Sequence, residues 1–305
     1  HTMQADSTRQ ESPVPGLDPI AARRWRERSR DASPWLHEEV GARMAERLRW
    51  IKQQPQQWLD WSALNGGLQA HRQVAELYPQ ARTLLAGPGS EAALRVLRRQ
   101  TPRGWNPLKW LGAGPALHDA SAGPVGLLWA NMALHQDPLP RALLGRWLEL
   151  LAVDGFLMFS CLGPDSLREL RAVYARLGWP APAHDFTDMH DWGDMLVEAG
   201  YAEPVMDMER ITLAYPDAAR LLRDLRDWGR NLNQARFAAL RGRGWRQALE
   251  RAIEQGLPRD EQGQLLLSFE LIYGHAVKPK PRVRLESTST VSVEQMRAML
   301  RQPRD

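Results

Sequence analysis

The chain has 305 residues, 43% of them hydrophobic, and a formal net charge of +4 at pH 7. This length and composition allow a sizeable core, whereas no apolar run approaches the ~20 residues of a membrane-spanning helix, so we expect no membrane partner. The single cysteine, Cys161, excludes a disulfide framework and a cysteine metal cluster, and a reducing cytoplasm is the expected location.

Basic and acidic residues are mixed along most of the chain. Only Lys52, Lys109, Lys278 and Lys280 are lysines among the 40 basic residues, and the others are arginines. A nucleic-acid-binding face concentrates positive charge and interleaves it with aromatic residues, and the chain shows no such pattern. We therefore expect no nucleic-acid partner.

The chain opens with a polar, proline-containing segment, and we expect residues 1–17 to be disordered. Pro19 then starts a helix that runs to about residue 30, and Pro34 starts a second helix. Apolar residues recur at helical spacing in the second helix, which predicts one buried face. These residues are Leu36, Val40, Met44, Leu48 and Ile51.

Short apolar strands alternate with helices over the middle of the chain. This alternation is typical of a parallel sheet with helices on both faces, so the sequence predicts an α/β fold. The predicted strands are 57–61, 82–86, 115–118, 125–131 and 155–161. The predicted helices are 67–77, 90–100, 138–151 and 164–178.

The pattern changes after residue 185. A helix at 189–199 precedes a strand at about 204–214, and a final strand is predicted at 265–276. Arg-rich helical sequence lies between these two strands. We expect it to form a lid insert of about 216–258 beside an antiparallel edge of the sheet.

The turn after the first predicted strand, Asp60–Gly67, lies where a Rossmann-like fold binds a nucleotide cofactor. Such a turn brings bare backbone close to the cofactor, and only glycine leaves room for that approach. Here Trp61, Ser62 and Leu64 carry side chains, and glycines stand only at the end of the turn. We therefore expect these side chains to occupy space that a cofactor needs.

Four later segments carry recognisable motifs, namely Leu127–Leu134, Gly163–Leu170, Asp188–Asp194 and Ile272–Pro279. The first is similar to the fourth strand of class I S-adenosylmethionine-dependent methyltransferases. The other three resemble the malonyl-acyl-carrier-protein O-methyltransferase family of biotin synthesis, and a methyltransferase-like assembly factor of mitochondrial complex I shares part of the pattern. The resemblance covers roughly residues 34–280, and it is strong from residue 125 onward and weak between residues 52 and 120.

This resemblance implies a class I methyltransferase domain at residues 18–280, with a mostly parallel Rossmann-like sheet, an antiparallel edge and a helical lid. Residues 281–305 then form a C-terminal tail, in which Ser292–Gln295 has capping-box spacing for a short helix. The family transfers a methyl group to the free carboxylate of a malonyl thioester on acyl carrier protein. Because a sulfonium methyl is already activated, the enzyme mainly aligns the carboxylate, which a basic residue holds.

The resemblance also implies cofactor-binding residues in the turn. Asp60 matches the acid of the family's first motif and would anchor the cofactor's amino end through water. Alternatively, Asp60 bonds to backbone amides of its own turn. Gly66 and Gly67 would flank a remnant pocket, or would only let the following helix pack closely on the sheet.

Further candidates follow the other strands. Asp119 stands near the position where the family has an acid beside the adenine. Asn131 and Leu134 lie at the carboxyl end of the fourth strand, where open α/β sheets bind ligands, although Asn131 could instead bond neighbouring loops. Arg30 replaces a tyrosine that lies near the reacting methyl in the family. It is the candidate catalytic residue, because it could hold a carboxylate, but it also places a cation beside a sulfonium.

Other parts of the cofactor motifs are missing. The first motif keeps only its last glycine in register, and no acid follows the second strand until Glu91, whereas the family has an acid there for the ribose hydroxyls. Each lost charge-assisted hydrogen bond costs about 1.5–3 kcal/mol, so two or three losses weaken binding roughly a thousandfold. The sequence therefore favours a degenerate family member that binds a protein or acyl ligand with little or no methyl transfer. The alternative is an active carboxyl O-methyltransferase, with S-adenosylmethionine as the cofactor in the active case and none in the degenerate case.

The predicted lid is rich in arginine. Residues 216–255 contain nine arginines against five acids. This excess predicts docking of an acidic carrier protein or another protein partner, or else only a solvated helix face. The nearby run His184–Asp191 is rich in histidine and aspartate, but Asp188 suits a helix N-cap and Asp191 suits the first helical turn. We therefore expect no metal site.

Overall fold

The computed structural model describes residues 11–28, 30–100, 114–229, 231–237, 242–282 and 293. In these ranges seven strands form one sheet, in the order β3-β2-β1-β4-β5-β7-β6. The strands are β1 (Gln57–Trp61), β2 (Arg82–Ala86), β3 (Ala116–Leu117), β4 (Val125–Ala130), β5 (Leu151–Leu162), β6 (Ala202–Tyr215) and β7 (Leu265–Val277).

The five neighbouring strands β3, β2, β1, β4 and β5 pair in parallel. The strand β7 is antiparallel to both of its neighbours, β5 and β6. This topology confirms the predicted α/β fold with a mostly parallel sheet and an antiparallel edge. The strands β1 and β2 have the predicted bounds, because each is a short apolar run between turns. The strand β5 begins at Leu151, earlier than predicted. Leu151 pairs with Val125 of β4, and a register shift separates this pair from the next one, Leu127 with Phe156.

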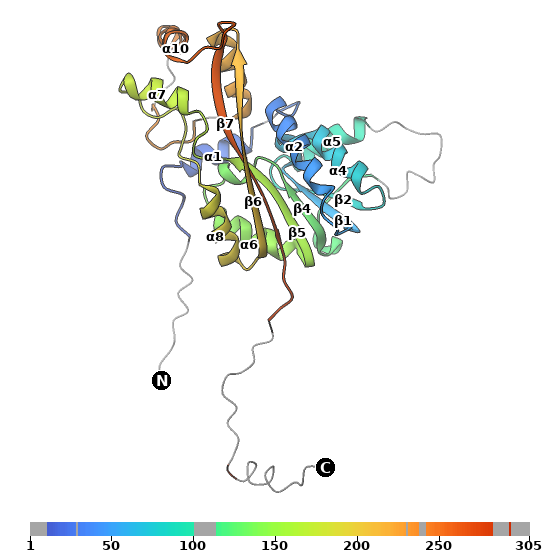
Figure 1. Cartoon of the computed structure of the whole chain (residues 1–305). Coiled ribbons are helices and arrows are strands. Elements are labelled where there is room, and N and C mark those ends of the chain that lie inside the picture. The colour runs from blue at the N-terminus through green and yellow to red at the C-terminus, as the bar shows by residue number, and fades with distance from the viewer. Residues whose placement is uncertain are drawn as a thin grey trace.

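Helices lie on both sides of the sheet (Figure 1). They are α1 (Pro19–Arg26), α2 (Trp35–Leu48), α3 (Ala63–Gly66), α4 (Leu68–Leu77), α5 (Ser90–Gln100), α6 (Pro140–Leu150), α7 (Arg168–Arg176), α8 (Met189–Ala199), α9 (Ala218–Trp228) and α10 (Arg243–Gly256). Side chains of a strand alternate between the two faces of the sheet. Trp58 accordingly packs in the apolar cluster of α2 and α4, whereas Leu59 and Trp61 pack in the cluster of α6 and α8.

The strands β6 and β7 extend past the other strands toward α7 and α10 (Figure 1). The helices α9 and α10 connect these two strands in the chain and fall in the predicted lid range. The predicted tail helix at Ser292–Gln295 lies outside the described residues, except for Val293.

Residues 11–17 contact the domain, although the sequence predicts disorder up to residue 17. Leu17 is buried in a cluster with Leu232, and the N–H of Val14 donates to the carbonyl of Pro138 at 2.9 Å. These partners are distant in the chain, so local composition does not reveal them. Residues 1–10 lie outside the described ranges.

Gly274 of β7 faces the ring of Phe159 across the pair that β7 forms with β5. A methyl group at Gly274 would overlap that ring, so we predict that Gly274→Ala lowers the free energy of unfolding by about 1–3 kcal/mol. Gly145 of α6 is the matched control, because a Cβ there meets no atom within 4 Å. Gly145→Ala should instead raise stability by about 0.5–1 kcal/mol. Urea denaturation measures both, and equal effects would contradict the packing account.

Candidate functional site

A cavity of about 760 Å³ lies at the carboxyl ends of β1, β2 and β4. We call it the strand-end cavity. Its walls include Trp61 and Leu64 after β1, Gly87–Gly89 after β2, and Gln136 after β4. The segment that follows α1, which includes Arg30, forms a further wall. Open α/β sheets bind ligands at this edge, and the volume lies in the range of small-molecule sites.

Trp61 forms a wall of this cavity and does not close it. Strand alternation directs the indole toward α6, where its ring centroid lies 5.8 Å from that of Trp147. The indole also packs against Gly87, and the Arg146 guanidinium lies 5.2 Å from its centroid. The expectation that bulky side chains fill the space for a ligand is therefore wrong.

The turn after β1 has a position in the left-handed region that favours glycine, and this position is occupied by a serine. Ser62 has a φ of 57°, in the left-handed region, and its Oγ donates to the carbonyl of Pro88 at 3.2 Å. Leu64 packs in an apolar cluster with Leu85 and Leu94. Both side chains thus have partners within the fold.

Asp60 is buried and bound within the fold. Its Oδ2 lies 2.8 Å from Nδ1 of His71, and its Oδ1 has no hydrogen-bond partner within the described ranges. Burial raises the pKa of the Asp60 carboxyl, and the hydrogen bond to His71 opposes this rise. Asp60 does not line the strand-end cavity, and its partner is a side chain of α4, not an amide of its own turn.

Asn131 connects the segments that surround the site. Its Nδ2 donates to the carbonyls of His37 and Gly66, and its Oδ1 accepts from the Ser160 hydroxyl. The side chain is fully buried and does not line the strand-end cavity. The structure thus agrees with the structural alternative, in which Asn131 bonds neighbouring segments.

Gly67, Asp119 and Leu134 also lie outside the lining of the strand-end cavity. Gly67 has a φ of 120° and lies against the Glu38 carboxylate, which accepts from two N–H groups in the first turn of α4. Asp119 is exposed and caps a short 3₁₀ helix through the N–H of Ser121, at 2.9 Å. Leu134 is buried among the side chains of α6.

Arg30 is the one predicted site residue that lines the strand-end cavity. Its Nη2 donates to the carbonyl of Asp227 at 2.7 Å, and the guanidinium lies 5.1 Å from the ring centroid of Trp25. Its Nη1 is buried and has no hydrogen-bond partner among the described residues. Burial lowers the pKa of the Arg30 guanidinium. Arg30 therefore holds an unused hydrogen-bond donor next to the cavity.

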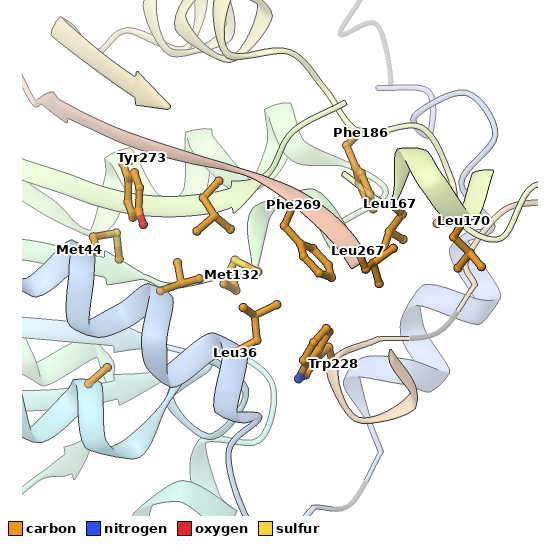
Figure 2. Close-up of a cluster of buried hydrophobic side chains, with 14 of the residues drawn as sticks. Leu36, Met44, Met132, Leu167, Leu170, Phe186, Trp228, Leu267, Phe269 and Tyr273 are labelled. Atoms are coloured by element: carbon orange, nitrogen blue, oxygen red, sulfur yellow. The ribbon is translucent and has the colours of Figure 1, made fainter. Parts of the chain in front are cut away.

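A second cavity, of about 630 Å³, lies under α9 and α10, and we call it the lid cavity. Its lining is mainly apolar, and Gln136 lines both cavities. Figure 2 shows Leu36, Trp228 and Phe269 facing one another near Met132, and the rings of Trp228 and Phe269 lie 5.4 Å apart. The two cavities are therefore neighbours, one at the ends of the strands and one under the lid.

Three buried histidines, His37, His135 and His184, line the lid cavity, and the sequence draws attention to His184 among them, as part of a run rich in histidine and aspartate. Burial lowers the pKa of His37 to about 4 and also lowers the pKa values of His135 and His184. The Nε2 of His184 donates to the carbonyl of His135 at 2.9 Å, so its unpartnered Nδ1 is an acceptor. These uncharged rings add polar groups to an apolar cavity.

In the part of the chain that the structure describes, no group of three His, Cys, Asp or Glu side chains could hold a metal ion. Asp188 caps α8 by accepting from the N–H of His190 at 2.7 Å. Across the same residues, no helix is long and apolar enough to cross a membrane.

Comparisons with known proteins assign the class and then the family. A putative methyltransferase of Bacillus halodurans aligns with 78% of this chain and all of its own, at a TM-score of 0.50 and 15% identity. The YcgJ protein of Bacillus subtilis aligns with 80% of this chain and 99% of its own, at a TM-score of 0.50 and 10% identity. Together with the strand order, these likenesses define a class I methyltransferase fold.

Curated relatives are more similar in sequence. The malonyl-acyl-carrier-protein O-methyltransferase of Gallionella capsiferriformans is 38% identical over 86% of this chain and 90% of its own. That of Laribacter hongkongensis is 37% identical over 83% of this chain and 86% of its own. The chain therefore belongs to the malonyl-acyl-carrier-protein O-methyltransferase family. No protein-family model matches it.

The pair of Asp60 and His71 has a testable energetic role. We predict that His71→Ala lowers the free energy of unfolding by roughly 3–5 kcal/mol, because it leaves a buried carboxylate without its partner. Adding Asp60→Asn should recover part of that loss. Urea denaturation of the two single variants and the double variant measures the interaction free energy between Asp60 and His71. Strictly additive losses in the free energy of unfolding would contradict this role of the pair.

The low pKa of His37 predicts acid sensitivity. The unfolded chain takes up a proton at this residue as the pH falls below about 6.5, whereas the folded chain does so only near 4, so stability is lost between these values. Between pH 7 and pH 5 this contribution is about 2 kcal/mol. His37→Asn keeps a donor for the carbonyl of Asn65, and its free energy of unfolding should fall less over that interval. Equal pH dependence in both proteins would refute the prediction.

Proposed function

We propose that this protein transfers a methyl group from S-adenosylmethionine to the free carboxylate of a malonyl thioester on an acyl carrier protein. The observation that carries the proposal is the pair of cavities that share Gln136. The strand-end cavity lies where the fold class binds its cofactor, and the lid cavity suits an acyl thioester arm. The names of the curated relatives, which describe this reaction, support the same assignment.

The residues present fit the cofactor in part. The strand-end cavity has sufficient volume, an aromatic wall at Trp61, and polar groups at Ser62 and Asn65. It lacks an acid after β2, and Asp60 is bound to His71. When bound, S-adenosylmethionine supplies a methyl group already activated for attack by a carboxylate oxygen. The residues of the chain then need only to orient the carboxylate and exclude water.

Arg30 is the proposed carboxylate-holding residue. Its Nη1 is buried and finds no partner in the part of the chain that the structure describes, and the Asp227 carbonyl and the Trp25 ring fix the orientation of the guanidinium. A guanidinium can bind a carboxylate through two parallel hydrogen bonds. Arg30 also lowers the pKa of His37, which lines the lid cavity, so its charge acts near the boundary between the two cavities.

The lid is the proposed docking surface for the acidic carrier protein. Arg226 and Arg246 line the lid cavity and are exposed, and Arg223 and Arg243 are exposed on the same two helices. Opposite charges across a contact speed association and favour the correct orientation. Asp60, Gly66, Gly67, Asp119, Asn131 and Leu134 are proposed to shape the site, and not to contact the cofactor directly.

A second candidate is a degenerate family member that binds the acyl thioester or a protein partner without transferring a methyl group. The specific observations that favour it are the absence of an acid after β2 and the engagement of Asp60 by His71. These features remove two groups that could hold the cofactor.

Titration calorimetry with S-adenosylhomocysteine, combined with a methyl-transfer assay on a malonyl-loaded carrier protein, separates the two candidates. The first candidate predicts micromolar binding and transfer. Absence of binding at millimolar concentration, together with absence of transfer, would leave only the degenerate protein.

Arg30→Gln tests the carboxylate role in the same assay. The substitution removes the charge-assisted hydrogen bonds, so we predict that KM for the malonyl thioester rises roughly tenfold to a hundredfold. Binding of S-adenosylhomocysteine should change much less, because it has no carboxylate at that position. Arg98→Gln on the exposed face of α5 is the control. An unchanged KM in the Arg30 variant would contradict the assignment.

A further inference from the structure

The strand-end cavity has a predominantly positive lining. Five arginines and three acids lie in its walls, and the only ion pair among them in the described residues is Arg26 with Asp137, at 2.7 Å. Four arginines are left without an acidic partner there, namely Arg28, Arg30, Arg95 and Arg146. An S-adenosyl sulfonium carries a positive charge of its own, so this lining is better matched to an anion.

These arginines come from three separate parts of the chain. Arg28 and Arg30 follow α1, Arg95 lies on α5 after β2, and Arg146 lies on α6 against Trp61. The cavity collects them at one site, where Arg30 is half-buried and Arg28, Arg95 and Arg146 are exposed. Guanidinium groups are preferred partners of phosphate, because they offer parallel donors.

The loop after β2 also differs from the corresponding loop of a Rossmann-like site. Gly87–Gly89 occupies the place where a Rossmann-like site has an acid that accepts hydrogen bonds from ribose hydroxyls. A Cβ at Gly89 would meet no atom of the described residues within 4 Å, so these residues leave the space beside Gly89 open. Replacing the acid by a nearby arginine is how such sites accommodate a phosphate on the ribose. Here Arg95 lines the cavity one turn and a half beyond the loop.

We propose that the strand-end cavity binds an adenosine nucleotide that carries a phosphate on the 2′- or 3′-hydroxyl of its ribose. Trp61 provides the aromatic wall against Gly87, Gly89 leaves room for the ribose, and Arg95 with Arg146 binds the phosphates. This inference concerns the same cavity as the proposed methyl transfer. It goes beyond that proposal, because such a nucleotide would compete with the cofactor and so regulate the site.

Titration calorimetry on the full chain tests the inference with three probes: adenosine 5′-monophosphate, adenosine 2′,5′-bisphosphate and adenosine 3′,5′-bisphosphate. We expect at least one bisphosphate to bind tenfold or more tightly than the monophosphate, and added salt to weaken that binding. The comparison of the two bisphosphates identifies the ribose hydroxyl that carries the phosphate. Failure of both to bind more tightly than the monophosphate would overturn the inference.

Arg95→Glu should weaken the preferred bisphosphate by tenfold or more. Arg98→Glu is the matched control, because Arg98 is exposed on the same helix outside the cavity lining. Equal effects of the two substitutions would also overturn the inference, and thermal unfolding checks that both variants fold. Parallel titration with S-adenosylhomocysteine separates the two proposals. Binding of that compound alone would refute only the nucleotide site, and binding of a bisphosphate alone would refute only methyl transfer.

Discussion

Asn131, fully buried just after β4, is the hydrogen-bonding centre of the ligand-binding edge of this fold. Its amide donates to main-chain carbonyls of α2 and of the turn after β1, and it accepts from Ser160 of β5. The Ser160 hydroxyl in turn accepts from the N–H of Met132 at 3.0 Å. A buried amide with this many partners is costly to disturb, so the three segments keep a fixed arrangement.

This arrangement explains why two cavities coexist at one edge of the sheet. The turn after β1 keeps a left-handed residue at Ser62, and the indole of Trp61 lies against α6. The strand-end cavity therefore stays open without the usual glycines. On the other face of the sheet, α2 and the lid enclose the apolar cavity that contains the uncharged histidines. Gln136 forms part of both walls.

The sequence predicts the sheet well, because apolar runs and turns are local signals. The bounds of β1, β2, α5 and α8 follow directly from them. The packing of Leu17 against Leu232 does not, because the two residues meet only after folding. No sequence motif predicts that His71 is the hydrogen-bond partner of Asp60, because this contact depends on which face of α4 carries His71.

The candidate site is harder to predict than the fold. Motif matching selects residues by their position after a strand, but most of these residues, such as Asp60, Asp119 and Asn131, form hydrogen bonds within the fold and do not line the strand-end cavity. The period-two alternation of β1 could have shown that Trp61 points away from α4, toward α6. The convergence of Arg30, Arg95 and Arg146 required the three-dimensional structure, because their elements are far apart in the sequence.

A crystal structure of the full chain grown with S-adenosylhomocysteine would test most directly whether the strand-end cavity is a ligand site. The account predicts that the adenosyl group lies between Trp61 and the Gly87–Gly89 loop, with Asn131 holding the same three segments. A structure in which Trp61 fills that space and the compound is absent would contradict it.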